Sequence, residues 1–158
     1  MAEIVWINDK VAVGPSHSFG GPSLEELRRA GVSVIVDLNA DPVEGKLATK
    51  LGMQYRGVYV QDHTAPTQEH LLKIATIVER AVAESRKVYV HCTAGVGRSP
   101  TCVAAYLIGT GRSFEEATAE VKAKRHVAWT DSGARDQLQA LRVFQSNVGK
   151  ASTKRAGT

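Results

Sequence analysis

A cysteine and an arginine six residues apart frame a loop of small residues, His91-Cys92-Thr93-Ala94-Gly95-Val96-Gly97-Arg98-Ser99. An apolar run at 87–90 precedes this loop, and a helix-like stretch at 99–108 follows it. A loop that opens a helix in this way attracts an anion, because backbone amides and the helix dipole converge there. A cysteine in such surroundings reacts as the thiolate. The spacing therefore predicts a nucleophile, Cys92, and an oxyanion clamp, Arg98, for phosphoryl transfer through cysteine.

The residues between the cysteine and the arginine are small enough to let a phosphate reach their backbone amides. The predicted phosphate-binding residues are Thr93, Ala94, Gly95, Val96, Gly97 and Arg98. The Ser99 hydroxyl is expected to hydrogen-bond the sulfur and stabilise it as a leaving group, and it can also cap the helix. His91 ends the strand. We expect His91 to orient the loop and support the thiolate, and an ordinary buried histidine is the alternative.

The pattern His-Cys-five residues-Arg-Ser/Thr resembles the signature of the cysteine-dependent protein tyrosine phosphatase superfamily. Chain length and the central position of the motif are similar to the dual-specificity branch, over roughly residues 11–145. The resemblance implies a general acid, an aspartate on a separate loop upstream of the cysteine. Asp62 lies thirty residues before Cys92 and is assigned this role in preference to Asp37 and Asp41.

The region after the motif departs from the family's usual pattern of Arg-Pro, Pro-Asn, Gly-Phe and Gln-Leu pairs. In register with these pairs the chain has Arg125-His126, Thr130-Asp131, Gly133-Ala134 and Gln137-Leu138, so the Gln-Leu pair is kept while both prolines, the asparagine and the phenylalanine are replaced. The family's substrate contacts in this stretch therefore do not carry over. The roles of His63, Cys102 and Asp131 stay open, and Trp129 is expected to pack in the interior rather than line the pocket.

The resemblance implies a two-step reaction. Cys92 attacks phosphorus to give a phospho-cysteine while Asp62 protonates the leaving oxygen; water positioned by Asp62 then releases phosphate while Ser99 stabilises the sulfur. The expected substrate is a phosphorylated protein, with phosphotyrosine first and phosphoserine or phosphothreonine besides. The loop is also similar to that of glucan phosphatases, so a phosphoglucan or another non-protein phosphate is the alternative. Arsenate reductases and sulfurtransferases also use a loop cysteine and arginine, but they give no reason for Asp62.

Composition bounds the partners and the location. The chain has 158 residues, of which 43% are hydrophobic and 23% charged, which suits one folded domain. A net charge of +4 favours anionic substrates, but without a basic stripe it does not indicate nucleic acid. The sequence contains no apolar run long enough to predict a membrane span, and its first residues do not have the pattern of a signal peptide. We therefore expect a cytoplasmic monomer without cofactor or metal, since no His, Asp and Glu cluster has metal-ligand spacing.

Strands that alternate with helices predict an α/β fold, a mostly parallel twisted sheet flanked by helices on both faces and phosphatase-like in architecture. The expected strands are 4–7, 11–13, 32–36, 53–60 and 87–90. The expected helices are 24–30, 43–51, 68–85, 99–108, 114–124 and a last helix that Asp131 or Ser132 caps and that ends near residue 146. Ser23 with Glu26 and Ser113 with Glu116 have the capping-box pattern at two of these helix starts. One domain is expected over 1–148, with a disordered tail at 149–158. Ligands of such sheets bind at the carboxyl ends of the strands, so the loops that carry Cys92 and Asp62 should face one pocket.

Overall fold

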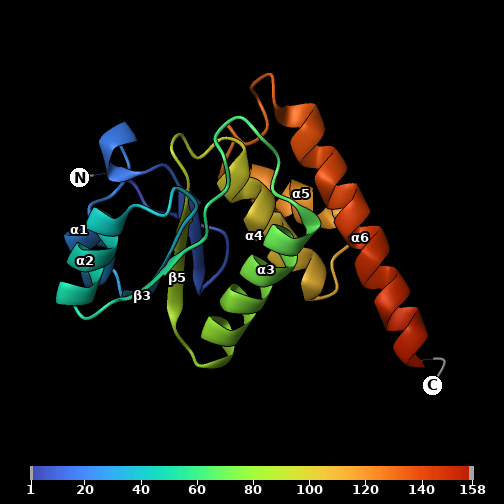
Figure 1. Ribbon diagram of the computed structural model, residues 1–158, viewed down its shortest axis with the longest axis horizontal. Coiled ribbons are helices and arrows are strands. Elements are labelled where there is room, and N and C mark those ends of the chain that lie inside the picture. Colours follow the sequence, from blue (N-terminus) through green and yellow to red (C-terminus); the bar gives the residue numbers. More distant parts are fainter. Residues whose placement is uncertain (1, 157–158) are drawn as a thin grey trace.

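The computed structural model describes residues 2–156, with the side chains of residues 2–149. Five strands are present in this range: β1 (Val5–Trp6), β2 (Val11–Gly14), β3 (Val32–Asp37), β4 (Gln54–Gly57) and β5 (Lys87–His91). The helices are the short 3-10 helix η1 (His17–Phe19), α1 (Leu24–Arg29), α2 (Pro42–Lys50), α3 (Gln68–Ala83), α4 (Arg98–Gly109), α5 (Phe114–Lys124) and α6 (Ala134–Ala156). Strands and helices alternate up to α4, and helices alone follow, as expected from the sequence (Figure 1).

The five strands form one sheet in the order β1-β2-β5-β3-β4. β1 pairs antiparallel with β2, whereas β5 runs parallel to both of its neighbours and β3 runs parallel to β4. The prediction of a mostly parallel sheet is therefore confirmed. β5 lies in the middle of the sheet, so the residue that follows it, Cys92, emerges at the centre of the carboxyl edge, where ligands of such sheets bind.

Alternating side chains along the strands build two apolar layers. Val34 and Val36 of β3 belong to the larger core, which includes residues of α3, α4, α5 and α6. Ile35 points to the other face and belongs with Leu27 and Ala48 to the smaller core under α1 and α2. Figure 1 shows α1 and α2 on one side of the sheet and α3, α4, α5 and α6 on the other, which confirms the predicted arrangement.

Helix α4 is buried along nearly its whole length, from Arg98 to Ile108. A helix that is covered on all sides packs at the centre of a domain. Its neighbours include α3, α5 and α6. The N-terminus of α4 is thereby fixed relative to the end of β5, and this fixes both ends of the loop that joins them.

Local capping chemistry sets several helix starts. Ser23 and Ser113 form the predicted capping boxes. Each serine hydroxyl accepts from the amide three residues on, and the glutamate at that position accepts from the backbone amide of the serine. Thr67 caps α3 in the same way, with His70 in place of the glutamate. The last helix differs from expectation at its start: Gly133 precedes it, and Asp131 instead folds a turn by accepting from the Gly133 amide.

Two predicted boundaries are wrong. β4 ends at Gly57 rather than at residue 60, because Val58 and Val60 donate to carbonyls at the end of β3 without continuing the ladder. α6 runs to Ala156, past the predicted end near 146, and takes in most of the expected tail. A single Gly149 costs a helix only about 1 kcal/mol, and the residues after it are mostly good helix formers. Residues 157–158 lie outside the described part, and the division at 148 stays a prediction.

Candidate active site

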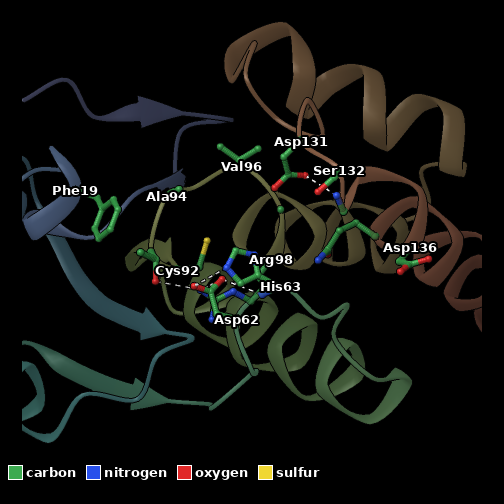
Figure 2. A pocket seen from close by; sticks show the side chains of 14 residues that line it. Phe19, Asp62, His63, Cys92, Ala94, Val96, Arg98, Asp131, Ser132 and Asp136 are labelled. Atoms are coloured by element: carbon green, nitrogen blue, oxygen red, sulfur yellow. Dashed lines mark hydrogen bonds and ion pairs between the residues drawn. The ribbon is translucent and has the colours of Figure 1, made fainter.

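The loop between β5 and α4 forms the floor of a cleft of about 400 Å³ (Figure 2). Its lining residues come from five places along the chain: Phe19; Asp62 and His63; Cys92, Thr93, Ala94, Val96, Gly97 and Arg98; Asp131, Ser132 and Gly133; and Asp136 and Gln137. Cys92 is only 3% exposed, and this small exposed part belongs to a side chain that lines the cleft. The structure thus brings the predicted loop and Asp62 to one pocket.

The carbonyl oxygens of the loop are turned away from the cleft. Those of residues 93, 94, 95 and 96 accept hydrogen bonds from the Ser16 amide, from Arg125 twice and from the Trp129 amide, at 3.0, 3.1, 3.0 and 2.8 Å respectively. Among the described residues, no backbone amide from 93 to 98 donates to another protein group. Carbonyls fixed outside a loop leave the amides free on its inside, which is the arrangement of an anion-binding nest. Arg125 was not predicted to support the loop, because nothing local in the sequence links it to residues 94 and 95.

Gly95 is required by a close approach between two loops. Its φ is +69°, a left-handed conformation that side-chain-bearing residues rarely adopt. A Cβ built there would lie 2.5 Å from the Gly14 carbonyl carbon and 2.6 Å from the Pro15 nitrogen. The loop between β5 and α4 therefore packs directly on the chain that leaves β2.

Ser99 lies within reach of the sulfur, as predicted. Its Oγ is 3.2 Å from Cys92 Sγ, and it also donates to the Gly14 carbonyl at 3.3 Å. Both side chains are buried. One hydroxyl hydrogen thus has two acceptors within reach, so it can turn from the carbonyl to a thiolate when the sulfur is charged.

Cys102 lies in α4, fully buried in the core and outside the cleft. Both cysteines are free thiols. Burial, and to a smaller extent the charge of Cys92, raise the pKa of the Cys102 thiol far above its usual range. Cys102 is therefore a neutral packing residue, which answers the question that the sequence left open.

The Arg98 guanidinium is held by four groups. One terminal nitrogen donates to the Val60 carbonyl at 2.7 Å and to Asn39 Oδ1 at 3.0 Å, and the other donates to Thr93 Oγ1 at 3.1 Å. The second nitrogen also lies 3.0 Å from a carboxylate oxygen of Asp62. The Arg98 side chain is 4% exposed and that of Asp62 is 52% exposed, so Asp62 covers the arginine from the solvent side. Neither Asn39 nor Val60 was predicted as a partner of Arg98. Only Asn39 had a local signal in the sequence, since it is a polar residue just after a parallel strand.

The two rival aspartates have other partners. Asp37 is fully buried, and its oxygens accept from the Asn39 and Asp41 amides and from the Tyr55 hydroxyl at 2.7 Å. Asp41 caps α2 through the Val43 amide. Of the three aspartates considered, only Asp62 lines the cleft.

The rim of the cleft carries the residues whose roles the sequence left open. His63 is 91% exposed beside Asp62, with its ring nitrogen 3.8 Å from the carboxylate. Asp131 and Asp136 contribute two further carboxylates to the lining.

Trp129 is buried and donates from its indole nitrogen to Thr101 at 3.0 Å, so the expectation that it packs in the interior is confirmed.

His91 lies behind the loop rather than in the cleft. Its ring contacts the Cys92 carbonyl at 3.1 Å and a Glu44 carboxylate oxygen at 2.6 Å. Asp37, Glu44 and His91 bring possible metal ligands within 4.8 Å of one another. His91 and Glu44 bond each other directly, and Asp37 accepts from the Asn39 and Asp41 amides and from the Tyr55 hydroxyl. The sequence did not point to Glu44.

Comparisons with known proteins agree with this geometry. A family model described as "Polymorphic toxin system, DSP-PTPase phosphatase" matches residues 15–112, more than half of the chain. The chain belongs to this phosphatase family. The matched segment runs from the chain after β2 through the loop between β5 and α4 and through α4 itself, and so includes Asp62, Cys92 and Arg98.

Several named phosphatases are similar to this family member. Dual specificity protein phosphatase 5 of Rattus norvegicus is 36% identical over 88 residues, 54% of this chain and 23% of the relative. Dual specificity protein phosphatase 12 of the same organism is 27% identical over 144 residues, 89% of this chain and 41% of the relative. The chain thus spans less than half the length of these curated relatives.

Solved structures are similar over almost the whole chain. The crystal structure of Tk-PTP in the active form is 30% identical, with a TM-score of 0.77 over 90% of this chain and 96% of that chain. The crystal structure of PTPMT1 is 26% identical, with a TM-score of 0.80 over 96% of this chain and 99% of that chain. Within residues 2–156, no helix combines the length and hydropathy that crossing a bilayer requires.

Proposed function

We propose that this protein is a phosphatase that hydrolyses phosphate monoesters through a phospho-cysteine intermediate. The observation that carries the proposal is the convergence of Cys92, the free loop amides, Arg98 and Asp62 on one cleft. The loop amides and Arg98 bind the phosphoryl oxygens and stabilise the charge that develops on them. No cofactor is part of this chemistry, since a cysteine thiolate supplies the nucleophile and a protonated aspartic acid supplies the proton.

The reaction consists of two displacements at phosphorus. The Cys92 thiolate forms the S–P bond as the bond to the leaving oxygen breaks, and Asp62 transfers its proton to that oxygen. Asp62, now a carboxylate, accepts a proton from water as the water oxygen attacks phosphorus and the S–P bond breaks. Ser99 donates a hydrogen bond from its hydroxyl group to the departing thiolate sulfur, 3.2 Å away. Inorganic phosphate leaves, and the thiolate is restored.

We propose a phosphorylated protein as the substrate, with phosphotyrosine first and phosphoserine or phosphothreonine besides. The names of the similar phosphatases support this class. Phe19, 62% exposed at the edge of the cleft, offers an apolar surface beside an aromatic leaving group. Asp131 and Asp136 disfavour a second phosphate on the substrate, because like charges repel in a cleft. The thiol chemistry suits a reducing compartment, so we place the activity in the cytoplasm and expect a monomer to carry it.

An assay with an aryl phosphate tests the mechanism. Wild-type protein should turn over, Cys92→Ser should be inactive yet still bind phosphate, and Asp62→Asn should be slowed most on substrates with poor leaving groups. The expected loss for Asp62→Asn is about 100- to 10,000-fold on an alkyl phosphate. Full activity in Cys92→Ser would refute the mechanism. Phosphopeptides carrying phosphotyrosine, phosphoserine or phosphothreonine, compared with a phosphoglucan, then test the substrate class; a preference for the glucan would overturn the protein assignment.

A further inference from the structure

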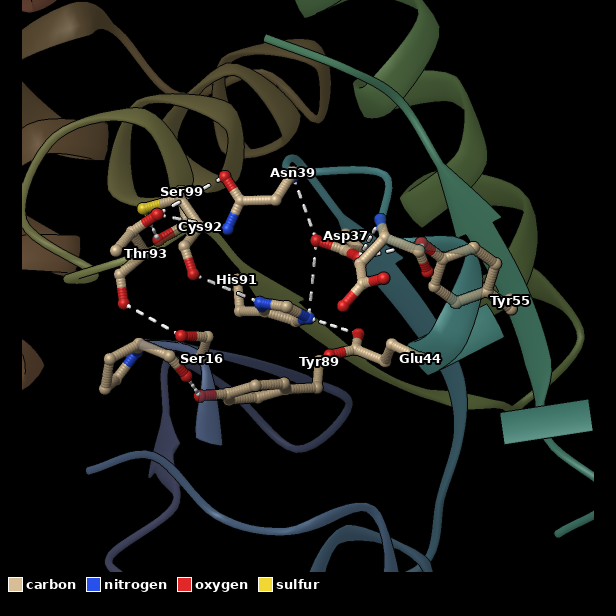
Figure 3. Close-up of polar contacts among 12 residues, drawn as sticks. Ser16, Asp37, Asn39, Glu44, Tyr55, Tyr89, His91, Cys92, Thr93 and Ser99 are labelled. Carbon is tan, nitrogen blue, oxygen red and sulfur yellow. Dashed lines mark hydrogen bonds and ion pairs between the residues drawn. The ribbon is translucent and has the colours of Figure 1, made fainter. Parts of the chain in front are cut away.

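A network of buried charged groups lies behind the catalytic loop (Figure 3). His91, Glu44 and Asp37 line a second cavity of about 640 Å³ beside α1 and α2. This cavity borders the catalytic cleft at Phe19 and Thr93. The His91 side chain is 4% exposed, while that of Glu44 keeps 19% of its surface open to this second cavity. Protons can therefore exchange with the network without passing through the cleft.

The hydrogen-bond partners of His91 define its charge. Nδ1 faces the Cys92 carbonyl at 3.1 Å, and a carbonyl oxygen can only accept. Nε2 faces a Glu44 carboxylate oxygen at 2.6 Å, which also accepts when ionised. Both ring nitrogens must then carry hydrogen, so the ring between these two acceptors is the imidazolium.

The surroundings of His91 hold this positive charge in place. From β3, an Asp37 oxygen lies 3.7 Å from Nε2. The Tyr89 ring of β5 stacks on His91 at 5.7 Å between centroids, and Tyr55 of β4 donates its hydroxyl to Asp37. Burial lowers the pKa of His91, but the hydrogen bond and charge of Glu44, together with Asp37, outweigh it, so the pKa is raised.

We propose that Glu44 is a positioning residue for the nucleophile: it holds the charged His91 ring against the Cys92 carbonyl, at the base of the phosphate-binding loop. The inference rests on the proposed function of that loop. A positive ring one residue before the sulfur stabilises the thiolate electrostatically, and its bond to the carbonyl fixes the peptide that carries the nucleophile. Glu44 acts through His91, because it lies in the second cavity and does not line the cleft.

Alkylation of Cys92 across a range of pH separates this role from a packing role. Glu44→Gln removes the charge but keeps the side-chain shape. Asp41→Asn is the matched control: Asp41 lines the same cavity, its side chain bonds the Val43 amide rather than His91, and asparagine caps α2 as well as aspartate does. Iodoacetamide rates would be measured from pH 5 to 9, with the adduct at Cys92 quantified by mass spectrometry.

We expect Glu44→Gln to be about three- to tenfold slower than wild type near pH 6 and equal to it near pH 9, because even an ordinary cysteine thiol is largely ionised at that pH. Asp41→Asn should follow wild type throughout. A Glu44→Gln profile identical to wild type, or slower by one constant factor at every pH, would overturn the proposal. A loss confined to low pH is a result that a merely structural role of Glu44 does not produce.

Proton NMR of the His91 ring gives a second measurement. It uses the wild-type protein and so does not depend on whether a variant folds. The ring should still be charged at pH 7, and a neutral ring there would overturn the proposal as well. Neither measurement depends on turnover. A wild-type protein without phosphatase activity but with the expected alkylation profiles would refute the proposed function while leaving the role of Glu44 standing.

Discussion

Replacing Asp62 with asparagine should tighten the binding of inorganic phosphate while it slows turnover. The Asp62 carboxylate lies 3.0 Å from the terminal nitrogen of Arg98 that faces the cleft. The other terminal nitrogen already donates to Val60 and Asn39. A phosphate that uses the cleft-facing nitrogen must therefore displace Asp62, and the variant has no carboxylate to displace.

The exposure of the pair sets the size of this effect. Asp62 is half exposed, and pairs of that kind contribute about 0.2–1 kcal/mol. This range corresponds to about 1.4- to 5-fold in the dissociation constant for phosphate. Arg98 is buried and held in one orientation, so little side-chain entropy opposes the pair. We therefore expect a value near the upper end.

Isothermal titration of wild type, Asp62→Asn and Asp131→Asn with inorganic phosphate measures this effect. Asp131→Asn removes one negative charge from the lining of the same cleft, but the Asp131 side chain bonds the Gly133 amide rather than Arg98. It should tighten phosphate binding less than Asp62→Asn does, because it changes only the overall charge. If Asp62→Asn binds phosphate no more tightly than Asp131→Asn, competition for Arg98 is the wrong explanation.

Three further predictions concern stability. Gly95→Ala should lower the free energy of unfolding by at least about 1–2 kcal/mol, since its φ is +69° and its Cβ would clash with the end of β2; thermal melts would show this, and Gly109→Ala, with open space around it, is the control that should not be destabilised. Tyr89→Phe should cost about 0.5–1.5 kcal/mol in urea titrations, because the buried hydroxyl donates to a backbone carbonyl at 2.6 Å; an unchanged midpoint would contradict this. The pKa of His91 is higher in the folded protein than in the unfolded chain, where it is about 6.5. The charged ring therefore stabilises the fold fully below pH 6.5, and the free energy of unfolding should decline as the pH rises from 6.5 through the pKa of the folded protein. Glu44→Gln should flatten this decline, and an equally steep decline in that variant would refute the assignment to His91.

Local sequence was sufficient for the elements and for the nucleophile. β-branched runs such as 32–36 predict buried strands, and serine followed by glutamate three residues on predicts the helix starts at 24 and 114. Cys92 and Arg98 share one continuous strand-loop-helix segment, so their spacing along the chain already defines their spacing in space. The helix end near 146 was placed wrongly because a lone glycine is a weak stop.

Tertiary structure alone decided what surrounds those two residues. Glu44, Asn39 and Arg125 act on the loop from segments that no local pattern connects to it. Glu44 and Asn39 reach it because β3 lies beside β5 in the sheet, and strand order is a property of the whole packed core. The pairing of Asp62 with Arg98 likewise depends on where the loop after β4 ends up relative to α4. The sequence by itself thus determined the reactive groups and their local geometry, because these follow from short-range backbone conformation. The charges and hydrogen bonds that tune them act through space, so only the folded chain could show them.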